Sequence, residues 1–517
     1  MDKKKTLTLP VLCLGAAALL CAAFAVFMLA APGAAPRLNA APSPEEVEVT
    51  VYETVGTASK ITLYEGPKTM TTSENAKISV NGSELFVYDV MVNHEHIWNE
   101  NTMPSETPMT YFDFEGEAAV SIRMPKLRNP VESAVVMPAA AGIVPTVADG
   151  TVSFTLTEPG QYTVVYNGSV NMATHIFANP PETDIPDKND PNVIFIEPGE
   201  WEADAIALKS DQTLYISGGA VLHAPVLANN AVNVTVRGRG IIDAGSGYDS
   251  WVHTGNARVP LDFVGCKNIV AEGITFINSN CWNFNSNSSE NADISNIKVI
   301  SGRQNGDGFT FQSCKNFVVR DSFCRSWDDT LVIKNYSSSL GSDNITFENI
   351  QIWTDLAQSM EIGYETNKGK MPNPEISNIT FKDITVLYNF HKPVISIHNS
   401  DNAYIHDILY QNIVVENALM QGDNGRNKEL IEMTLAKSGW SAVTDEFGIT
   451  KGVVIDGLTV LNTADGKVPA SRFAGADAEH QIEDVTIRNV TILGEAITGL
   501  DAMNVRVEDF CSNITVE

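Results

Sequence analysis

The sequence is short of cysteine and of basic residues. Only 7 of its 517 residues are cysteines, and no two of them have the CxxC spacing, which argues against a disulfide scaffold and against a zinc site built on paired thiolates. Lys and Arg number 34 against 63 Asp and Glu, which gives a formal charge of −29. Because nucleic-acid affinity comes mostly from cations that neutralise phosphates, we expect no nucleic-acid partner. A basic membrane-surface role is disfavoured for the same reason.

Charge is also absent from a stretch near the N-terminus. Residues 11–31 carry none, and residues 3–5 before them are all lysine. This is the layout of an export signal, and the apolar stretch is long enough to span a bilayer as an uncleaved anchor. A cleaved signal and a membrane tether through residues 11–31 both stay open, with a lipid anchor on Cys21 as a weaker third reading. In each case we expect an exported protein, secreted or held at the cell surface.

The other cysteines and the overall composition bound the rest of the chain. Hydrophobic residues make up 44% and charged residues 19%, which suffices for sizeable cores and excludes a disordered chain. We expect buried thiols and leave one disulfide open for the five cysteines beyond the N-terminal stretch: Cys266, Cys281, Cys314, Cys324 and Cys511.

Helical periodicity is scarce, and strand patterns divide the chain into three parts. Residues 1–46 hold the signal or anchor and a linker rich in Pro and Ala. In residues 47–190, short alternating segments are separated by turn pairs such as Asn81-Gly82 and Asp149-Gly150. This pattern predicts an N-terminal antiparallel β-sandwich domain. Residues 191–517 form the third part, which repeats.

The repeated unit begins with Asn or Asp and continues with an alternating β-branched segment. Clear copies are NIVAEGITF from residue 268, NITFENIQI from 344, NITFKDITV from 378 and DVTIRNVTI from 484. Coils of little more than 20 residues with insertions are typical of a β-solenoid, in which stacked coils bury a face that one coil cannot bury alone. We predict an all-β chain whose residues 191–517 form a right-handed parallel β-helix. A propeller is the rival, but its blades of about 40 residues fit the intervals poorly.

Asparagine recurs at one phase of the repeat, in several cases within an Asn-x-Ser/Thr sequon. Asn tolerates left-handed backbone conformation and bonds to nearby groups in tight turns. We interpret these residues as a stacked ladder of turns and not as glycosylation sites.

Acidic residues recur at similar distances from the repeat markers. Asp307 and Asp328 are 21 residues apart, close to one coil, and Asp329 follows directly. Three carboxyl groups on neighbouring coils would raise at least one pKa by mutual repulsion, which leaves a proton donor beside ionised bases. Glycosidic hydrolysis needs that combination. Outside a solenoid, the same acids would fit a calcium site or exposed turns equally well.

The segments around these aspartates resemble a known family. NGDG at residues 305–308 and WDDTLVIK at residues 327–334 are similar to the active-site strands of glycoside hydrolase family 28, the polygalacturonases, which shares its fold and three aspartates with the dextranases and isopullulanases of family 49. The resemblance covers the chain from about residue 193 and implies a pectin-lyase-like β-helix and an O-glycosyl hydrolase. It implies that Asp328 is the general acid and that Asp307 and Asp329 activate the water of an inverting displacement.

The same resemblance bears on the substrate. Gln358 stands where the family has a histidine, and SIH at residues 396–398 stands where it has Arg-Ile-Lys, whose cations hold a uronate carboxylate. Losing both cations in so acidic a protein favours a neutral, dextran-like α-glycan, with a pectin-related glycan still open. Asn305 opens the first motif, although Gly306 replaces the usual threonine, and Lys334 matches a lysine of several bacterial relatives.

Aromatic and polar side chains near these coils are further candidates for contact with the sugar. We expect two or three of Trp282, Trp327, Tyr336, Trp353 and Tyr364 to stack on it, and Glu365 is a candidate hydrogen-bonding residue. The predicted substrate-binding residues are Asn305, Lys334, Gln358, Glu361, His398, Trp327 and Tyr364.

The expected partner is a polysaccharide or oligosaccharide, with no metal and no organic cofactor. Two other functions stay open. One is a polysaccharide lyase on the same architecture, which would need a basic proton abstractor and usually calcium. The other is a non-catalytic, glycan-binding surface solenoid.

Overall fold

The computed structural model describes residues 39–40, 50–53, 59–94, 105–245, 258–422 and 428–517. The expected signal or anchor of residues 11–31 lies outside these ranges. Within them, the one helical element is a 3-10 turn, η2 (Ala139–Ala141), and no helix has the length and apolar character needed to cross a membrane. The rest of the regular structure is β-strand.

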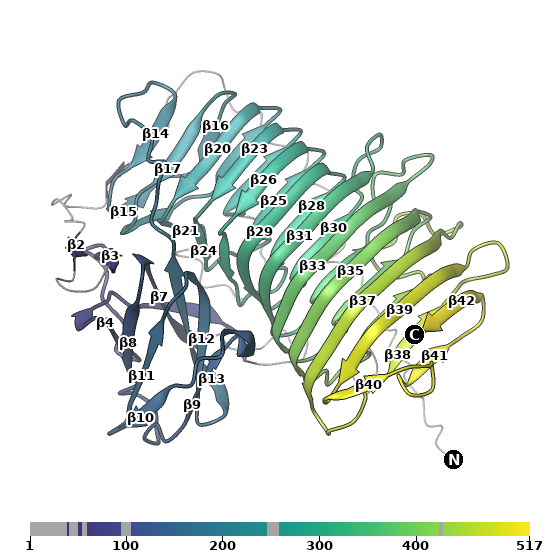
Figure 1. Ribbon diagram of the computed structural model, residues 1–517. Helices are drawn as coiled ribbons and strands as arrows, with labels where there is room; N and C mark the ends of the chain where they lie inside the picture. The colour runs from purple at the N-terminus through teal and green to yellow at the C-terminus, as the bar shows by residue number, and fades with distance from the viewer. Residues whose placement is uncertain (1–38, 41–49, 54–58, 95–104, 246–257, 423–427) are drawn as a thin grey trace, which may run out of the picture.

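Two long sheets form a right-handed parallel β-helix, whose coils stack along one axis (Figure 1). The first sheet has 19 strands: β1 (Asn39–Ala40), β14 (Val193–Ile196), β15 (Gly199–Glu202), β17 (Thr213–Ile216), β18 (Ala220–His223), β20 (Val232–Gly238), β21 (Ile241–Asp243), β23 (Lys267–Glu272), β24 (Thr275–Ile277), β26 (Glu290–Ser295), β27 (Lys298–Ile300), β29 (Lys315–Ser326), β31 (Ser342–Thr354), β33 (Glu375–Asn389), β35 (Tyr404–Ala418), β37 (Ile449–Thr463), β39 (Ile482–Ile492), β40 (Glu495–Ile497) and β42 (Cys511–Val516). The second has 11: β16 (Ile206–Leu208), β19 (Val226–Asn229), β22 (Leu261–Val264), β25 (Phe284–Asn287), β28 (Phe309–Gln312), β30 (Leu331–Lys334), β32 (Met360–Tyr364), β34 (Ile395–Asn399), β36 (Ile431–Thr434), β38 (Ser471–Ala474) and β41 (Val505–Val507).

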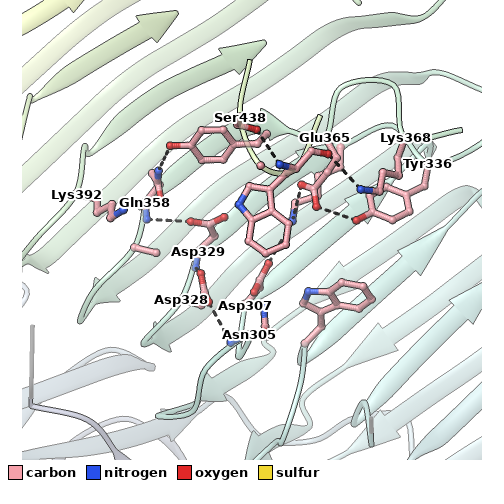
Figure 2. Close-up of a pocket in the computed structure, with 16 residues that line it drawn as sticks. Asn305, Asp307, Asp328, Asp329, Tyr336, Gln358, Glu365, Lys368, Lys392 and Ser438 are labelled. Atoms are coloured by element: carbon pink, nitrogen blue, oxygen red, sulfur yellow. Dashed lines mark hydrogen bonds and ion pairs between the residues drawn. The ribbon is translucent and has the colours of Figure 1, made fainter. Parts of the chain in front are cut away.

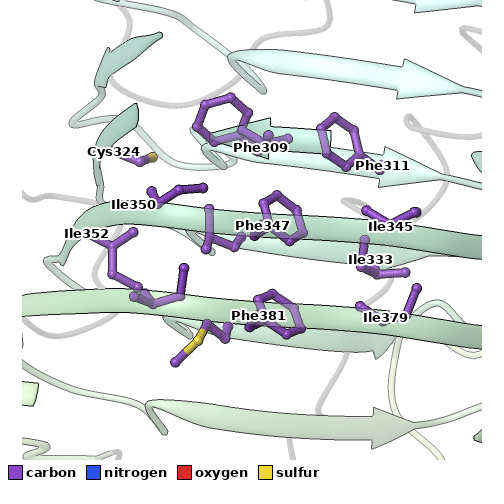
Figure 3. Packing of buried hydrophobic residues seen from close by; sticks show 14 of the residues in the cluster. Phe309, Phe311, Cys324, Ile333, Ile345, Phe347, Ile350, Ile352, Ile379 and Phe381 are labelled. Atoms are coloured by element: carbon purple, nitrogen blue, oxygen red, sulfur yellow. The ribbon is translucent and has the colours of Figure 1, made fainter. Parts of the chain in front are cut away.

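The core of the β-helix lies between these sheets and repeats from coil to coil. Because the strands pair in parallel and in register, residues at the same phase of the repeat stack on one another. From the opposite sheet, the ring of Phe311 in β28 stacks on that of Phe347 at 5.5 Å. Phe347 of β31 and Phe381 of β33 pair in register, and their rings lie 5.1 Å apart and within 9° of parallel (Figure 3). Tyr410 continues the stack at 4.9 Å. The predicted parallel β-helix is confirmed.

The asparagines of the repeat form the expected ladder of turns. Asn268, Asn291, Asn316 and Asn344 have φ angles between 55° and 62°. Each side-chain amide donates to the Oδ1 atom of the asparagine one coil before, at 2.8–3.1 Å. The left-handed backbone and the side-chain bonds together explain why asparagine recurs here.

The described strands between residues 50 and 179 form two further sheets, here called the N-terminal layers. One comprises β4 (Lys77–Val80), β5 (Ser83–Glu84), β8 (Ala118–Arg123), β10 (Thr146–Ala148) and β11 (Thr151–Leu156). The other comprises β2 (Thr50–Glu53), β3 (Lys60–Leu63), β6 (Tyr88–Val92), β7 (Ser105–Glu115), β9 (Ala134–Met137), β12 (Gly160–Tyr166) and β13 (Ser169–Asn179). Both contribute to one buried cluster, as the sheets of a sandwich do. One pairing, β7 with β13, is parallel, and the domain boundaries at residues 46 and 190 stay predictions.

The N-terminal layers lie beside the β-helix and pack on its flank (Figure 1). Met109 and Phe177 of the layers share a buried cluster with Ile300, Phe323 and Trp353 of the β-helix. All five cysteines of the β-helix are free thiols, so the disulfide left open by the sequence does not form among them.

Candidate active site

The three predicted aspartates lie in turns that precede neighbouring strands of the 11-stranded sheet. Asp307 precedes β28, and Asp328 and Asp329 precede β30. Phe309 of β28 pairs with Leu331 of β30. Asp307 and Asp329 each lie two residues before that pair and so occupy the same position on successive coils. Asp328 is one residue out of this register.

Backbone amides hold the aspartates in place. Asp328 accepts hydrogen bonds from the amides of Asn305 and Asp329, both at 3.0 Å. Asp329 Oδ1 accepts one from the amide of Gln358, which belongs to the next coil, at 3.1 Å. Gln358 Nε2 in turn donates to the hydroxyl of Tyr364 at 3.2 Å. Parallel stacking therefore joins turns from three coils into one polar cluster.

This cluster lines a cavity of about 550 Å³ (Figure 2). Its volume is in the range of small-ligand sites, roughly 300–1,000 Å³. The lining residues are Trp282, Asn305, Asp307, Asp328, Asp329, Lys334, Tyr336, Ala357, Gln358, Tyr364, Glu365, Lys368, Lys392, Ser438, Gly439 and Trp440. In the described part of the chain, no group of three His, Cys, Asp or Glu side chains is placed to hold a metal ion.

Burial keeps these carboxyl groups from ionising as freely as they would in water. It raises the pKa of Asp307 to about 7, with Lys334 opposing the shift and Asp328 adding to it. The pKa of Asp329 is raised well above its usual value, by burial and then by repulsion from Asp328 and Asp307. Burial also raises the pKa of Asp328, against the two amides that stabilise its anion. Such a cluster titrates as a unit and can retain a proton near neutral pH.

Lys334 supplies the compensating charge within the cavity. Its Nζ atom lies 3.6 Å from Asp307 Oδ2 and 3.3 Å from Glu365 Oε2, and the hydroxyl of Tyr336 donates to Glu365 at 2.9 Å. Burial alone would lower the pKa of Lys334, but Glu365 and Asp307 outweigh burial and hold it well above the usual value. The lysine is therefore a fixed cation beside the aspartates.

Two of the predicted sugar contacts, Glu361 and His398, lie behind the cavity wall. They are 0% and 4% exposed and do not line the cavity. His398 Nδ1 lies 2.9 Å from the carboxylate of Glu361, its Nε2 lies 3.2 Å from Glu432 Oε2, and its ring stacks on Tyr364 at 4.3 Å. Burial would lower the pKa of His398, but the two glutamates raise it to about 10. This placement corrects the expectation of direct contact, since the pair supports Tyr364 from behind.

The aromatic candidates divide in the same way. Trp282, Tyr336 and Tyr364 line the cavity. Trp327 is 1% exposed and Trp353 is 0% exposed, and neither lines it. The expectation that Trp327 contacts the sugar therefore does not match its position, because its ring is enclosed by the protein.

Several lining residues were not predicted from the sequence. Lys368, Lys392 and the segment 438–440 come from loops outside the recognised motifs. Lys368 Nζ donates to the backbone oxygen of Trp440 at 3.2 Å, which joins the loops after β32 and β36. Two cations of the family motifs are missing, which favoured a neutral glycan, but three lysines line the cavity. In the sequence, only an insertion after residue 434 could have pointed to these lining residues. The length of an insertion does not predict the path of its backbone.

The sequence matches the model of a known protein family. The family model for glycosyl hydrolases family 28 matches residues 215–508, more than half of the chain, and this range includes every described residue that lines the cavity. A search of the curated proteins finds no match. Among solved structures, Dex49A from Penicillium minioluteum aligns with a TM-score of 0.55 at 13% identity, covering 89% of this chain and 98% of that one.

Two polygalacturonases align less closely. The hyperthermoactive exopolygalacturonase from Thermotoga maritima has a TM-score of 0.48 at 15% identity, covering 62% of this chain and 84% of that one. The family 28 exopolygalacturonase from Yersinia enterocolitica has a TM-score of 0.48 at 13% identity, with coverages of 91% and 99%. The likeness to Dex49A shows a shared fold, and the match over residues 215–508 shows the family. The chain belongs to glycosyl hydrolases family 28 and is an O-glycosyl hydrolase.

Proposed function

We propose that Asp307, Asp328 and Asp329 cleave an O-glycosidic bond of a polysaccharide or oligosaccharide in a single displacement that inverts the anomeric carbon. The observation that carries the proposal is that three carboxyl groups with raised pKa values line one cavity. An inverting site needs one protonated carboxyl for the leaving oxygen and an ionised one for water, about 6.5–9.5 Å apart.

In the proposed step, Asp328 protonates the leaving oxygen while Asp307 and Asp329 take a proton from the attacking water. The amides of Asn305 and Asp329 both donate to Asp328 and favour its anion in the empty cavity. Donation by Asp328 therefore requires that the proton shared by the cluster lies on this residue when the sugar oxygen is in place. Lys334 favours ionisation of the two bases.

The proposed sugar contacts follow from the lining of the cavity. Asn305, Lys334, Gln358 and Tyr364 present polar groups to it. Trp282, Tyr336 and Trp440 add ring faces or edges, and sugars pack on aromatic rings through their apolar C–H surfaces. Glu361, His398 and Trp327 would act only through the side chains that they support.

The substrate is proposed as a neutral, dextran-like α-glycan or a pectin-related glycan. The missing family cations support the neutral glycan, whereas Lys368 and Lys392 at the cavity support keeping acidic glycans in the test. Export, with cleavage or retention of residues 11–31, is proposed as the route by which the enzyme reaches such polymers.

A panel of dextran, pullulan, pectin fragments and galactans tests this proposal with the purified protein. Wild type should release reducing sugar from at least one polymer, and Asp328→Asn should lose nearly all turnover, on the order of 10³-fold or more. Circular dichroism should show the same folded β-signal in both. Near-normal turnover in folded Asp328→Asn would contradict the assignment.

The same panel separates the two alternative functions. A lyase would produce an unsaturated sugar with ultraviolet absorbance and would lose activity with a chelator. A glycan-binding solenoid would bind a polymer without releasing reducing ends, and Asp328→Asn would not change its behaviour.

A further inference from the structure

A buried arginine lies directly behind the turn that carries the aspartate pair. Arg325, in β29, is three residues before Asp328 and is 0% exposed. Its Nε donates to Asp355 Oδ2 at 2.9 Å and its Nη2 donates to Asp355 Oδ1 at 3.3 Å. The two fully buried groups therefore form a bidentate ion pair. The guanidinium also lies 4.3 Å over the ring of Trp353. Such a planar contact fixes orientation as well as distance.

This ion pair joins the two turns that shape the catalytic part of the cavity. Asp355 is three residues before Gln358, as Arg325 is three before Asp328. The amide of Asp355 donates to the carbonyl of Ser326 at 2.9 Å, between the same two turns. Buried hydroxyl groups also link these two turns. They belong to Ser326, Thr330, Thr354 and Ser359, and neighbouring oxygens lie 2.7–2.8 Å apart.

The remaining face of the guanidinium is held by the N-terminal layers. Arg325 Nη1 lies 3.2 Å from Nε2 of His175, a 0% exposed residue of β13. Because arginine only donates, Nε2 must accept and the imidazole must be neutral with its proton on Nδ1. Thr163 Oγ1, 2.9 Å from Nδ1, is placed to accept the hydrogen bond that this N–H donates. Burial and the charge of Arg325 lower the pKa of His175 well below its usual value, as a neutral ring requires.

We propose that His175 is a positioning residue for hydrolysis, contributed to the active site by the N-terminal layers. The inference rests on the proposed function. The layers would influence hydrolysis through Arg325 and Asp355, neither of which lines the cavity. Without an acceptor at Nη1 the guanidinium would turn toward another one, and the turns holding Asp328 and Gln358 would move with it. Displacements of about 1 Å at reacting groups can cost 10²-fold in rate.

Two substitutions at His175 in the full chain test this role. His175→Leu removes the acceptor at similar volume, and we expect kcat to fall about 10- to 100-fold with KM within about 2-fold of wild type. His175→Gln keeps an oxygen that can accept from Arg325, and we expect it to restore most of kcat. Asp113→Asn is the matched control, because Asp113 of β7 faces Arg239 of the β-helix at 3.4 Å across the same interface but away from the cavity lining. It should lower the melting temperature without changing kcat.

Amide hydrogen exchange supplies a readout that does not need turnover. Peptides spanning residues 326–330 and 355–359 should lose protection in His175→Leu and keep it in Asp113→Asn. If His175→Leu does not fold, Thr163→Val, which removes the partner of Nδ1, should reproduce the loss of kcat and of protection. Unchanged kcat and unchanged protection in a folded His175→Leu would overturn the inference. If instead Asp328→Asn keeps its turnover, the three-aspartate proposal is the one that fails.

Discussion

At the scale of single residues, one lysine favours ionisation of the buried carboxyl groups. Lys334 opposes the raised pKa of each aspartate in the cavity. An opposite charge within about 4–6 Å lowers a carboxyl pKa by roughly 1–3 units. The lysine thereby favours the ionised carboxyl group that the proposed step needs as a base, against the effect of burial.

Lys334→Met should therefore move the pH profile of hydrolysis. Removing the cation raises the pKa of the carboxyl groups, so the base becomes ionised only at higher pH. We expect the acidic limb of the kcat/KM profile to move upward by roughly 1–3 pH units. Steady-state rates of the purified variant between pH 4 and 9 measure this shift.

Lys368→Met is the control for that prediction. Lys368 lines the same cavity, but it is not among the groups that shift the pKa of Asp307 or Asp329 most. Its removal should change KM and leave both limbs in place. An acidic limb that does not move in Lys334→Met, or that moves equally in both variants, would contradict the role given to Lys334.

The sequence predicted which residues belong to the candidate site better than it predicted what surrounds each of them. The motifs around Asp307 and Asp328, the aspartates proposed to act in hydrolysis, are short and local in sequence, so they could be recognised without a structure. For Glu361, alternation along β32 puts the side chain on the outer face, opposite the core residues Met360 and Ile362. It could not show that His398 and Tyr364 would cover that face.

At the scale of elements, the asparagine ladder stabilises the repeated turns of the β-helix. Each asparagine bridges two coils and takes a backbone conformation that most residues avoid. The turns at this edge therefore tolerate little substitution, although their side chains are exposed.

Asn316→Ala should destabilise the protein without affecting hydrolysis. The substitution removes one bond to Asn291 and one from Asn344 and forces alanine to φ near 59°. We expect a loss of about 1–3 kcal/mol in the free energy of unfolding, measured by denaturant titration. Asn316→Gly, which accepts this φ, should lose less, and Val318→Thr on the same exposed face should stay near wild type. Equal losses for alanine and glycine would show that φ is not the cause.

Periodicity predicted the strands, but it could not predict the course of the loops. A coil of fixed length repeats its inward residues, so the parallel β-helix was predictable from spacing. The insertion after β36 has no such constraint. It is held by contacts to a distant loop, as when Lys437 Nζ donates to the backbone oxygens of Ser400 and Asp401, at 3.3 and 3.2 Å. Those contacts bring Trp440 to the cavity, which spacing alone does not reveal.

At the scale of the whole molecule, charge is distributed unevenly. The chain has a formal charge of −29, yet Lys334, Lys368 and Lys392 gather at one cavity. Net charge is a property of the entire surface and so gave little guidance to the local potential that a substrate meets. The composition predicted the absence of a basic surface and missed this local concentration.

The strand patterns predicted an N-terminal sandwich domain and a β-helix, but they did not predict the contact between the N-terminal layers and the β-helix. His175 and Arg325 are 150 residues apart in sequence, and each looks like an ordinary core or surface residue in its own segment. Only the packing of β13 on the β-helix brings them together. The role proposed for the N-terminal layers thus arises from tertiary structure alone.

The stereochemistry of the first product tests the central claim most directly. On the polymer that the panel identifies, proton NMR during the first minutes of hydrolysis reports the anomer released before mutarotation equilibrates it. A single displacement by Asp307, Asp328 and Asp329 predicts a product whose anomeric configuration is opposite to that of the bond cleaved. A product that retains the configuration, or one that carries a double bond, would contradict it.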